Sequence, residues 1–256
     1  MKLNYTEQGA GTAVILIHGI FGSLSNLGNL ARNLSAGYRV LSVDLRNHGD
    51  SPHERSMDLQ LMAADIIELM DDLALDAAHL VGHSMGGKVA MQLAMNYPQR
   101  VDSLLVADIA PADYPQQNIN IINALESISK VSIESRKMAD NELVRYQIDA
   151  PTRAFILKGL RRESNGQFVL KFNLSSIVAN YASKLVLAPV GEPYTGPSLF
   201  LKGQTSAYIQ DKHIPVIESL FPRSTLQVIR GAGHWLHAEK PDDFNNLVSA
   251  FLGANS

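Results

Sequence analysis

His79-Leu-Val-Gly-His-Ser-Met-Gly-Gly87 is the most informative stretch of this sequence. Its middle part, Gly82-His-Ser-Met-Gly86, has the pattern Gly-x-Ser-x-Gly, which is typical of a serine carried on a sharp turn between a strand and a helix. The flanking residues agree, since a β-compatible apolar segment precedes the pattern and the strongly helix-forming segment 88–96 follows it. We therefore predict that Ser84 is a nucleophile at such a turn. The two glycines are expected because a Cβ at either position would collide with the turn.

Composition and charge restrict the kind of partner. The 256-residue chain is long enough for one large α/β domain with a sizeable core. Hydrophobic residues make up 46% and charged residues 18% of it, which excludes a disordered chain and a strongly charged nucleic-acid-binding module. A formal net charge of −3 without a Lys/Arg cluster gives no attraction to phosphate backbones or anionic lipids. We therefore expect a small-molecule partner and no nucleic acid, and no signal indicates an oligomeric state.

The chain contains no cysteine, which excludes disulfides and metal sites built from thiolates. Residues 1–9 lack the apolar core of a signal peptide, and no apolar stretch of 18 residues occurs anywhere. The sequence thus predicts a cytoplasmic protein without a membrane span.

Apolar runs alternate with helical patterns through most of the chain. Ala13-Val-Ile-Leu-Ile17 is continuous and rich in β-branched residues, which is typical of a strand buried on both faces of a parallel sheet. Segment 59–73 has apolar residues at helical spacing, with Asp65 and three further acids expected on its solvent side. The predicted fold class is α/β, with a mostly parallel central sheet flanked by helices. Strands are expected at 2–7, 13–17, 40–44, 76–81, 101–107, 197–202 and 225–230, and helices at 26–34, 59–73, 88–96, 214–220 and 241–252.

The alternation stops between residues 112 and 190, where helical patterns follow one another. This block indicates an insertion into a core domain made of residues 1–111 and 191–256. Because it enters directly after a strand whose carboxyl end faces the turn at Ser84, we expect it to cover the site as a helical cap. Its helices are expected near 116–129, 132–145, 150–159 and 174–181, with an isolated strand or hairpin at 167–172.

A serine hydroxyl needs an adjacent histidine as base, and that histidine needs a carboxylate to orient it. Gly231-Ala-Gly-His-Trp235 follows the last predicted strand, and its glycines allow a loop to carry His234 toward the serine. His237 is expected in the first turn of the next helix.

A developing oxyanion needs two converging backbone N–H groups. Met85, the residue after the serine, is predicted to supply one, and Ile20, in the loop after strand 13–17, the other. The neighbouring side chains of Phe21, His83 and Trp235 are expected to line the substrate pocket.

Taken together, these motifs resemble the α/β-hydrolase superfamily. The amino-acid sequences of the loops at 19–27, 44–51 and 107–111 are similar to those of the YbfF-type bacterial esterases and their abhydrolase-domain relatives. The resemblance implies the α/β-hydrolase fold, with a helical cap over the site. It also implies a serine hydrolase that cleaves carboxylic esters or acyl thioesters, with acyl-CoA among the candidate substrates. It also implies that Arg46 and His48 form hydrogen bonds in a structural loop and take no part in the chemistry.

The acid is where the chain departs from the commoner superfamily pattern. Many relatives carry an aspartate after the penultimate strand, and here that stretch is Gly203-Gln-Thr-Ser206. Asp108, at the end of the strand after the helix 88–96, is the preferred acid because a strand end fixes its position, and the YbfF-like group also takes its acid from this segment. Asp211 is the alternative, and Asp113 is the last choice.

Other chemistries on the same fold stay open at this point. A cofactor-free haloperoxidase or a C–C bond hydrolase would keep the serine, histidine and aspartate, and a non-catalytic binding protein would keep only the scaffold. No cofactor is expected. No metal is expected either, since His79 and His83 have no convergent partner ligands.

Overall fold

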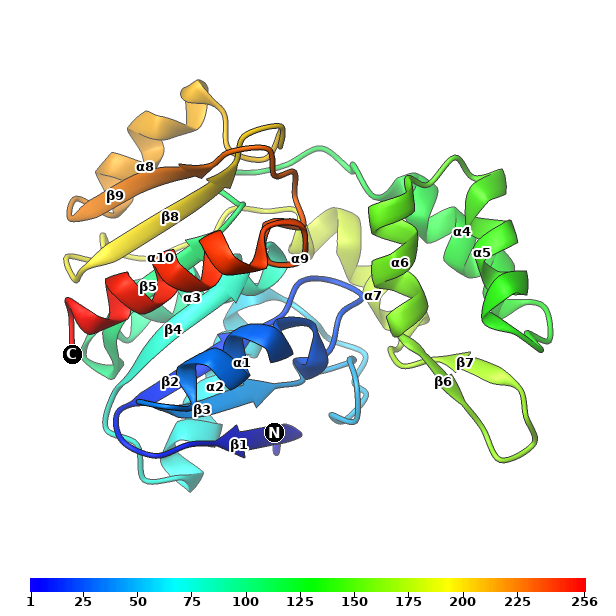
Figure 1. Ribbon diagram of the computed structural model, residues 1–256, viewed down its shortest axis with the longest axis horizontal. Helices are drawn as coiled ribbons and strands as arrows, with labels where there is room; N and C mark the ends of the chain where they lie inside the picture. The colour runs from blue at the N-terminus through cyan, green and yellow to red at the C-terminus, as the bar shows by residue number, and fades with distance from the viewer.

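The computed structural model describes residues 1–256. A seven-stranded sheet in the order β1-β3-β2-β4-β5-β8-β9 forms its centre, and every neighbouring pair is parallel except β1 with β3 (Figure 1). The strands are β1 (Tyr5–Gln8), β2 (Ala13–Ile17), β3 (Arg39–Val43), β4 (Ala78–His83), β5 (Val101–Ala107), β8 (Ser198–Gly203) and β9 (Ser224–Ile229).

Helices cover both faces of this sheet. Helices α1 and α10 pack with one another on one face, and α2 and α3 pack together on the other, each pair closing a separate hydrophobic core. No helix has both the length and the apolar content that crossing a membrane requires. The helices of this part are α1 (Gly28–Leu34), α2 (Leu59–Asp72), α3 (Met85–Asn96), α8 (Ile214–Leu220), α9 (Leu236–Glu239) and α10 (Pro241–Gly253).

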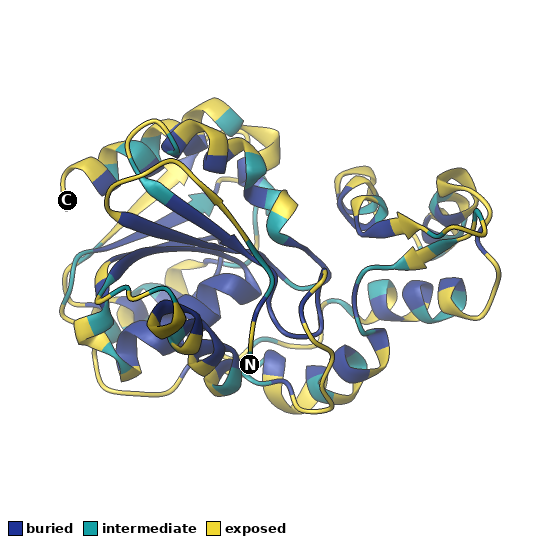
Figure 2. Ribbon diagram, turned by 90° about the horizontal axis from the view of Figure 1, so that it is seen from below, coloured by how far each residue is buried: buried dark blue, intermediate teal, exposed yellow.

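The apolar runs of the sequence explain the parallel sheet. All residues of β2 and β4 are buried, because each strand has a helix layer on both of its faces. Figure 2 shows the central strands as a buried layer between partly exposed helices. The predicted α/β class with a mostly parallel sheet is confirmed.

The segment between β5 and β8 leaves the sheet at the carboxyl ends of the strands (Figure 1). It is mainly helical, and its one hairpin pairs β6 with β7 in antiparallel orientation. The strand or hairpin expected at 167–172 is therefore part of a hairpin. Its elements are α4 (Ile119–Ser129), α5 (Arg136–Arg145), α6 (Ala150–Lys158), β6 (Leu160–Arg162), β7 (Phe168–Leu170), α7 (Leu174–Asn180) and a π-helical turn at Tyr181–Leu185.

The structure corrects the expectation for Asp65. This residue is buried, not solvent-facing, and both carboxylate oxygens accept hydrogen bonds from the buried Arg46 guanidinium, at 2.6 and 2.7 Å. Helical spacing alone could not reveal this, because the partner comes from the loop after β3 and not from α2 itself. A carboxylate tolerates burial when a guanidinium pairs with it in this bidentate way.

Two smaller corrections concern element ends. The edge strand expected at 2–7 begins only at Tyr5, because Leu3 turns into the core and the Asn4 N–H donates to Ser51 Oγ at 2.8 Å. The helix expected from residue 26 starts as a 3-10 turn at Leu24–Leu27 and becomes α-helical at Gly28.

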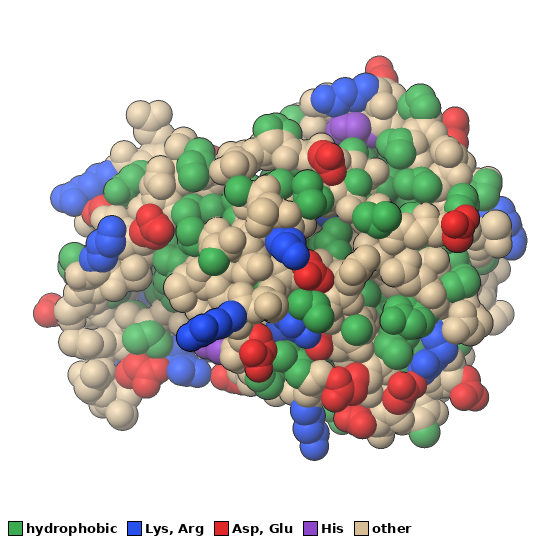
Figure 3. All heavy atoms as spheres, turned by 180° about the vertical axis from the view of Figure 1, so that it is seen from behind, with side chains coloured by type: hydrophobic (Ala, Val, Ile, Leu, Met, Phe, Trp, Pro, Cys, Tyr) green, Lys and Arg blue, Asp and Glu red, His purple; other side chains and the backbone are tan.

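Figure 3 shows acidic and basic side chains interspersed on one face of the molecule, with hydrophobic side chains between them. This face offers no continuous basic surface to a nucleic acid.

Candidate active site

Ser84 lies between β4 and α3 in a strained backbone conformation, with φ +55° and ψ −121°. Non-glycine residues rarely adopt a positive φ, so such strain often marks a functional position. A Cβ at Gly82 would lie 2.3 Å from the Gly86 carbonyl oxygen, and one at Gly86 would lie 2.3 Å from the Ile17 carbonyl oxygen. A collision with the turn is therefore confirmed for Gly82, whereas at Gly86 the obstacle is the end of β2, which packs against the turn.

His234 contacts both Ser84 and Asp108. It lies in the loop after β9, with Nδ1 2.7 Å from Asp108 Oδ2 and Nε2 3.1 Å from Ser84 Oγ. The ionised carboxylate can only accept, so Nδ1 carries the proton and the Nε2 lone pair accepts from the Ser84 hydroxyl. This tautomer is the one that lets the imidazole take a proton from serine.

Asp108 follows β5 directly and is fully buried, with φ +54°. Its Oδ1 accepts a hydrogen bond from the Gly203 N–H at 3.0 Å, and its Oδ2 also accepts one from the Ser206 hydroxyl. The loop after β8, where many relatives carry the acid, therefore supplies two donors to a carboxylate that comes from β5. These two donors fix the orientation of the carboxylate.

The other two acids considered from the sequence lie elsewhere. Asp211 begins a 3-10 turn after β8, is exposed, and makes no contact with His234. Asp113 is also exposed, and its Oδ1 accepts from the Ala188 N–H at 2.7 Å. Of the three, the structure brings only Asp108 to the histidine.

The loop after β2 presents a free backbone donor beside the serine. Gly19 to Gly22 form a turn closed by a 3.1 Å hydrogen bond, and the Phe21 N–H inside it donates to His48 Nε2 at 3.1 Å. No protein acceptor takes the Ile20 N–H. Met85 is the first residue of α3, so its N–H has no acceptor within the helix. Of the loop donors, Ile20 thus remains available and Phe21 does not.

Two neutral histidines shape this loop. His48 Nδ1–H donates to the Arg46 carbonyl at 3.0 Å, and His18 Nδ1–H donates to the Gly19 carbonyl at 2.7 Å while its Nε2 accepts from the Leu45 N–H at 3.1 Å. Burial lowers the pKa of His48 to about 3 and also lowers the pKa of His18. Each ring therefore acts as one donor and one acceptor, and the hydrogen-bonding role expected for His48 is confirmed.

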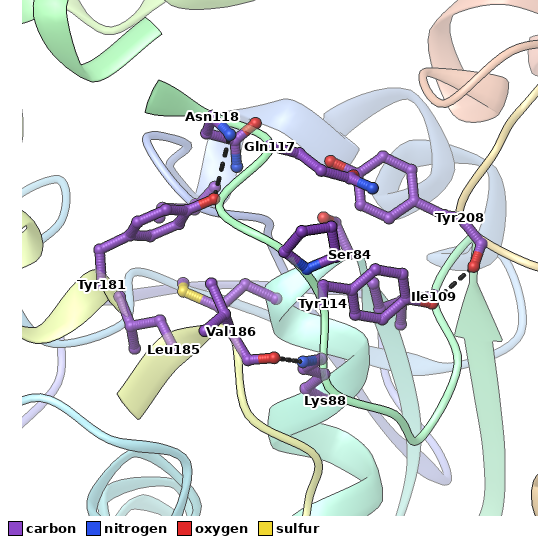
Figure 4. A pocket seen from close by; sticks show the side chains of 13 residues that line it. Ser84, Lys88, Ile109, Tyr114, Gln117, Asn118, Tyr181, Leu185, Val186 and Tyr208 are labelled. Carbon is purple, nitrogen blue, oxygen red and sulfur yellow. Dashed lines mark hydrogen bonds between the residues drawn. The ribbon is translucent and has the colours of Figure 1, made fainter. Parts of the chain in front are cut away.

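Two cavities, one somewhat larger than the other, meet at Ser84. Both are lined by Ile20, Asn118 and Tyr208 in addition to the serine. The larger cavity (Figure 4) is otherwise lined by Met85, Lys88, Ile109, Tyr114, Pro115, Gln117, Tyr181, Leu185 and Val186. The smaller one is otherwise lined by Gly19, Phe21, His83, Ile121, Thr152, Phe155, Ile156, His234 and Trp235, so it contains all three residues predicted for the pocket.

Comparison with known proteins agrees with this geometry. Residues 12–241 match the protein family described as alpha/beta hydrolase fold. The chain belongs to the α/β-hydrolase family. It is 40% identical to the mouse protein named sn-1-specific diacylglycerol lipase ABHD11, over 94% of this chain and 80% of that protein. It is 34% identical to the Escherichia coli protein named Esterase YbfF, over 98% of this chain and 99% of that protein.

A solved structure described as a marine microorganism esterase superposes on this α/β-hydrolase with a TM-score of 0.91. The two are 36% identical, and the match covers 98% of this chain and 99% of the other. The resemblance to YbfF-type esterases seen in the loop motifs therefore extends along the whole chain.

Sequence reasoning missed two buried polar side chains of this α/β-hydrolase, both on α3. Lys88 Nζ donates to the carbonyls of Val186 and Leu187, at 2.8 and 2.6 Å. One turn later, the Gln92 amide exchanges hydrogen bonds of 2.6 and 2.9 Å with the backbone of Val190. Burial lowers the pKa of Lys88 to about 7. Lys88 and Gln92 thus tether α3 to the segment 186–190, and Figure 4 shows the hydrogen bond between Lys88 and Val186. The signal in the sequence was a lysine and a glutamine four residues apart within an apolar helix pattern.

Tyr208 was also not singled out from the sequence, although its ring lies against His234, with ring centroids 4.0 Å apart. It stands in the loop after β8, two residues beyond Ser206, where no motif marks it. No group of three or more histidine, aspartate or glutamate side chains is arranged to hold a metal ion.

Proposed function

We propose that this α/β-hydrolase is a serine esterase that works through a Ser84–His234–Asp108 triad and an acyl-enzyme intermediate. One observation carries the proposal: a single imidazole contacts the serine hydroxyl at 3.1 Å and the buried carboxylate at 2.7 Å. The names of the relatives, two esterases and a lipase, support ester bonds as the target.

In the first half of the reaction, the Ser84 hydroxyl passes its proton to His234 Nε2 while Oγ attacks the substrate carbonyl carbon. Asp108 stabilises the imidazolium that forms. The carbonyl oxygen becomes an oxyanion, and the free N–H groups of Ile20 and Met85 are the donors proposed to receive it. These donors need no reorganisation, because neither gives up a hydrogen bond within the protein.

In the second half, the bond between the carbonyl carbon and the leaving oxygen or sulfur breaks, and the imidazolium of His234 protonates the leaving group. Water then repeats the attack with His234 as base, which releases the carboxylic acid and restores the Ser84 hydroxyl. Because His234 must reach the leaving group, the alcohol or thiol portion belongs in the smaller cavity, which His234 lines. The acyl portion then belongs in the larger cavity, which includes Met85 and the apolar side chains of Leu185 and Val186.

We also propose that residues 112–190 form a cap on a core made of 1–111 and 191–256. Both cavities take part of their walls from this segment, including Tyr181 and Leu185 for the larger one and Ile121 and Phe155 for the smaller one. Chain-length preference should therefore depend on the cap. Leu185→Ala should favour longer acyl chains, whereas its matched control Ile121→Ala should change the preference among alcohols at a constant acyl group. Unchanged relative rates in both variants would contradict this role.

The proposal is tested with purified protein on p-nitrophenyl esters and acyl-CoAs of graded length. The ratio of rates on matched esters and thioesters decides which bond is preferred. Ser84→Ala should abolish turnover and should prevent labelling by a fluorophosphonate probe, which modifies wild-type Ser84. Equal labelling of the two proteins would remove Ser84 from the mechanism.

A further inference from the structure

Tyr208 lies face to face with the imidazole of His234. Their ring centroids are 4.0 Å apart and their planes differ by 21°. The other aromatic neighbours approach differently, since the His83 ring is tilted by 41° at 4.8 Å and the Trp235 ring is T-shaped at 5.2 Å. Only Tyr208 therefore presents the negatively polarised face of a ring in parallel to the imidazole.

The backbone of Tyr208 is fixed by the same network that holds the acid. Its N–H donates to Ser206 Oγ at 3.2 Å, and that hydroxyl donates to Asp108. Its carbonyl accepts from the Tyr114 hydroxyl (Figure 4). The backbone that carries the ring is thus tied to the loop after β8 and to the entrance of the 112–190 segment, and it shares the Ser206 hydroxyl with the carboxylate.

The ring also stands at the reacting centre. Tyr208 lines both cavities, as do Ser84 and Ile20. Burial raises the pKa of its phenol, so the group stays neutral at physiological pH and offers a ring quadrupole rather than a phenolate charge. A neutral aromatic face attracts a cation more strongly than a neutral imidazole.

We propose that Tyr208 is a positioning residue for the reaction: its ring holds the plane of His234 between Ser84 and Asp108 and stabilises the imidazolium form. This inference rests on the proposed triad. Since His234 is neutral in the resting state and charged during attack, the cation–π part of the contact strengthens as the transition state forms. Such a contact raises kcat, and because Tyr208 also lines both cavities, its loss adds a smaller change in KM.

Two substitutions separate the ring from the hydroxyl. Tyr208→Phe keeps the stacked ring and should retain kcat within about twofold of wild type, whereas Tyr208→Leu keeps apolar volume without a ring and should lower kcat about tenfold with KM within about threefold. Tyr181→Leu is the matched control, because Tyr181 lines the larger cavity without touching His234, and it should change KM more than kcat. Tyr208→Gln serves as a second variant without a ring and should behave like Tyr208→Leu.

The imidazole NMR signals of His234 supply a readout that does not need turnover. They should be shielded by the stacked ring in wild type, in Tyr208→Phe and in Ser84→Ala, and this shielding should be lost in both variants without a ring. Equal kcat losses in Tyr208→Phe and Tyr208→Leu, or a change confined to KM, would overturn the proposal. So would unchanged signals in the variants without a ring. If Ser84→Ala kept wild-type turnover, the proposed triad would fail, while the shielding would still report the stacking.

Discussion

Acidification from pH 7 to pH 5 should destabilise this protein through its buried histidines. Burial lowers the pKa of both His48 and His237 to about 3, against an ordinary value of 6.5. In the unfolded chain these rings gain protons below pH 6.5, while in the folded protein they stay neutral down to about pH 3. The unfolded state therefore binds more protons in this window, and stability is lost as the pH falls.

The magnitude follows from these values. At pH 5, about 1.5 units below the ordinary pKa, protonation lowers the free energy of the unfolded chain by about 2 kcal/mol for each ring. The two histidines together therefore reduce the free energy of unfolding by about 4 kcal/mol. Burial also lowers the pKa of His18 and His83, which adds to the loss. Protonating His48 would also remove the acceptor for the Phe21 N–H and release the loop that carries Ile20.

Urea denaturation at pH 7, 6 and 5 measures this effect as a fall in the free energy of unfolding. His237→Leu should reduce the fall by about 2 kcal/mol, the share of one histidine, and it breaks no hydrogen bond of the His237 ring. His53→Gln is the matched control, since His53 is exposed, and it should keep the whole fall. A wild-type change below about 1 kcal/mol between pH 7 and pH 5, or a His237→Leu variant that keeps the full pH dependence, would refute the reasoning.

Asp108→Asn should lower kcat by up to about 10⁴-fold, as for the corresponding acid of serine proteases, while Asp211→Asn should keep most activity. Steady-state kinetics with p-nitrophenyl esters compares the two variants, and the reverse ranking would assign the acid to the later loop. Asp65→Asn should cost about 3–5 kcal/mol of stability by urea denaturation, because it leaves the buried Arg46 guanidinium without its carboxylate, and a cost below about 1 kcal/mol would show that the pair is not buried in solution. Burial lowers the pKa of Lys88 to about 7, so above pH 7 the folded protein loses the Lys88 proton while the unfolded chain keeps it. The free energy of unfolding of the wild type should therefore rise by about 2 kcal/mol between pH 7 and pH 9. Lys88→Met should lack this rise in the same denaturation series, and an identical slope in both proteins would contradict the buried tether.

Local patterns carried most of the fold prediction. The β-branched run Ala13–Ile17 coincides with β2, because a strand buried on both faces must be apolar throughout. The segment Val101–Ala107 coincides with β5, in which only Asp102 is exposed. The turn at Ser84 was also predictable, since a strained backbone with close approaches at Gly82 and Gly86 leaves few alternatives to glycine.

Polar contacts between distant segments were not predictable in this way. Asp65 was expected in solvent because helical periodicity describes one helix, whereas its partner Arg46 comes from another element. The roles of Lys88 and Tyr208 depend on segments about 98 and 26 residues away, and no local pattern encodes such a distance.

The sequence by itself determined that a serine would stand on a strained turn at the carboxyl end of a parallel sheet, because strand burial and glycine sterics act over a few residues. Chain order restricted the acid to a few aspartates, with Asp108 preferred. Only the tertiary structure brought Asp108 within 2.7 Å of His234 and turned Ser206 toward the same carboxylate. The physical reason is that β5 and β8 are neighbours in the sheet, so the loops at their carboxyl ends meet, and hydrogen-bond partners there are chosen by strand order in space and not by position along the chain.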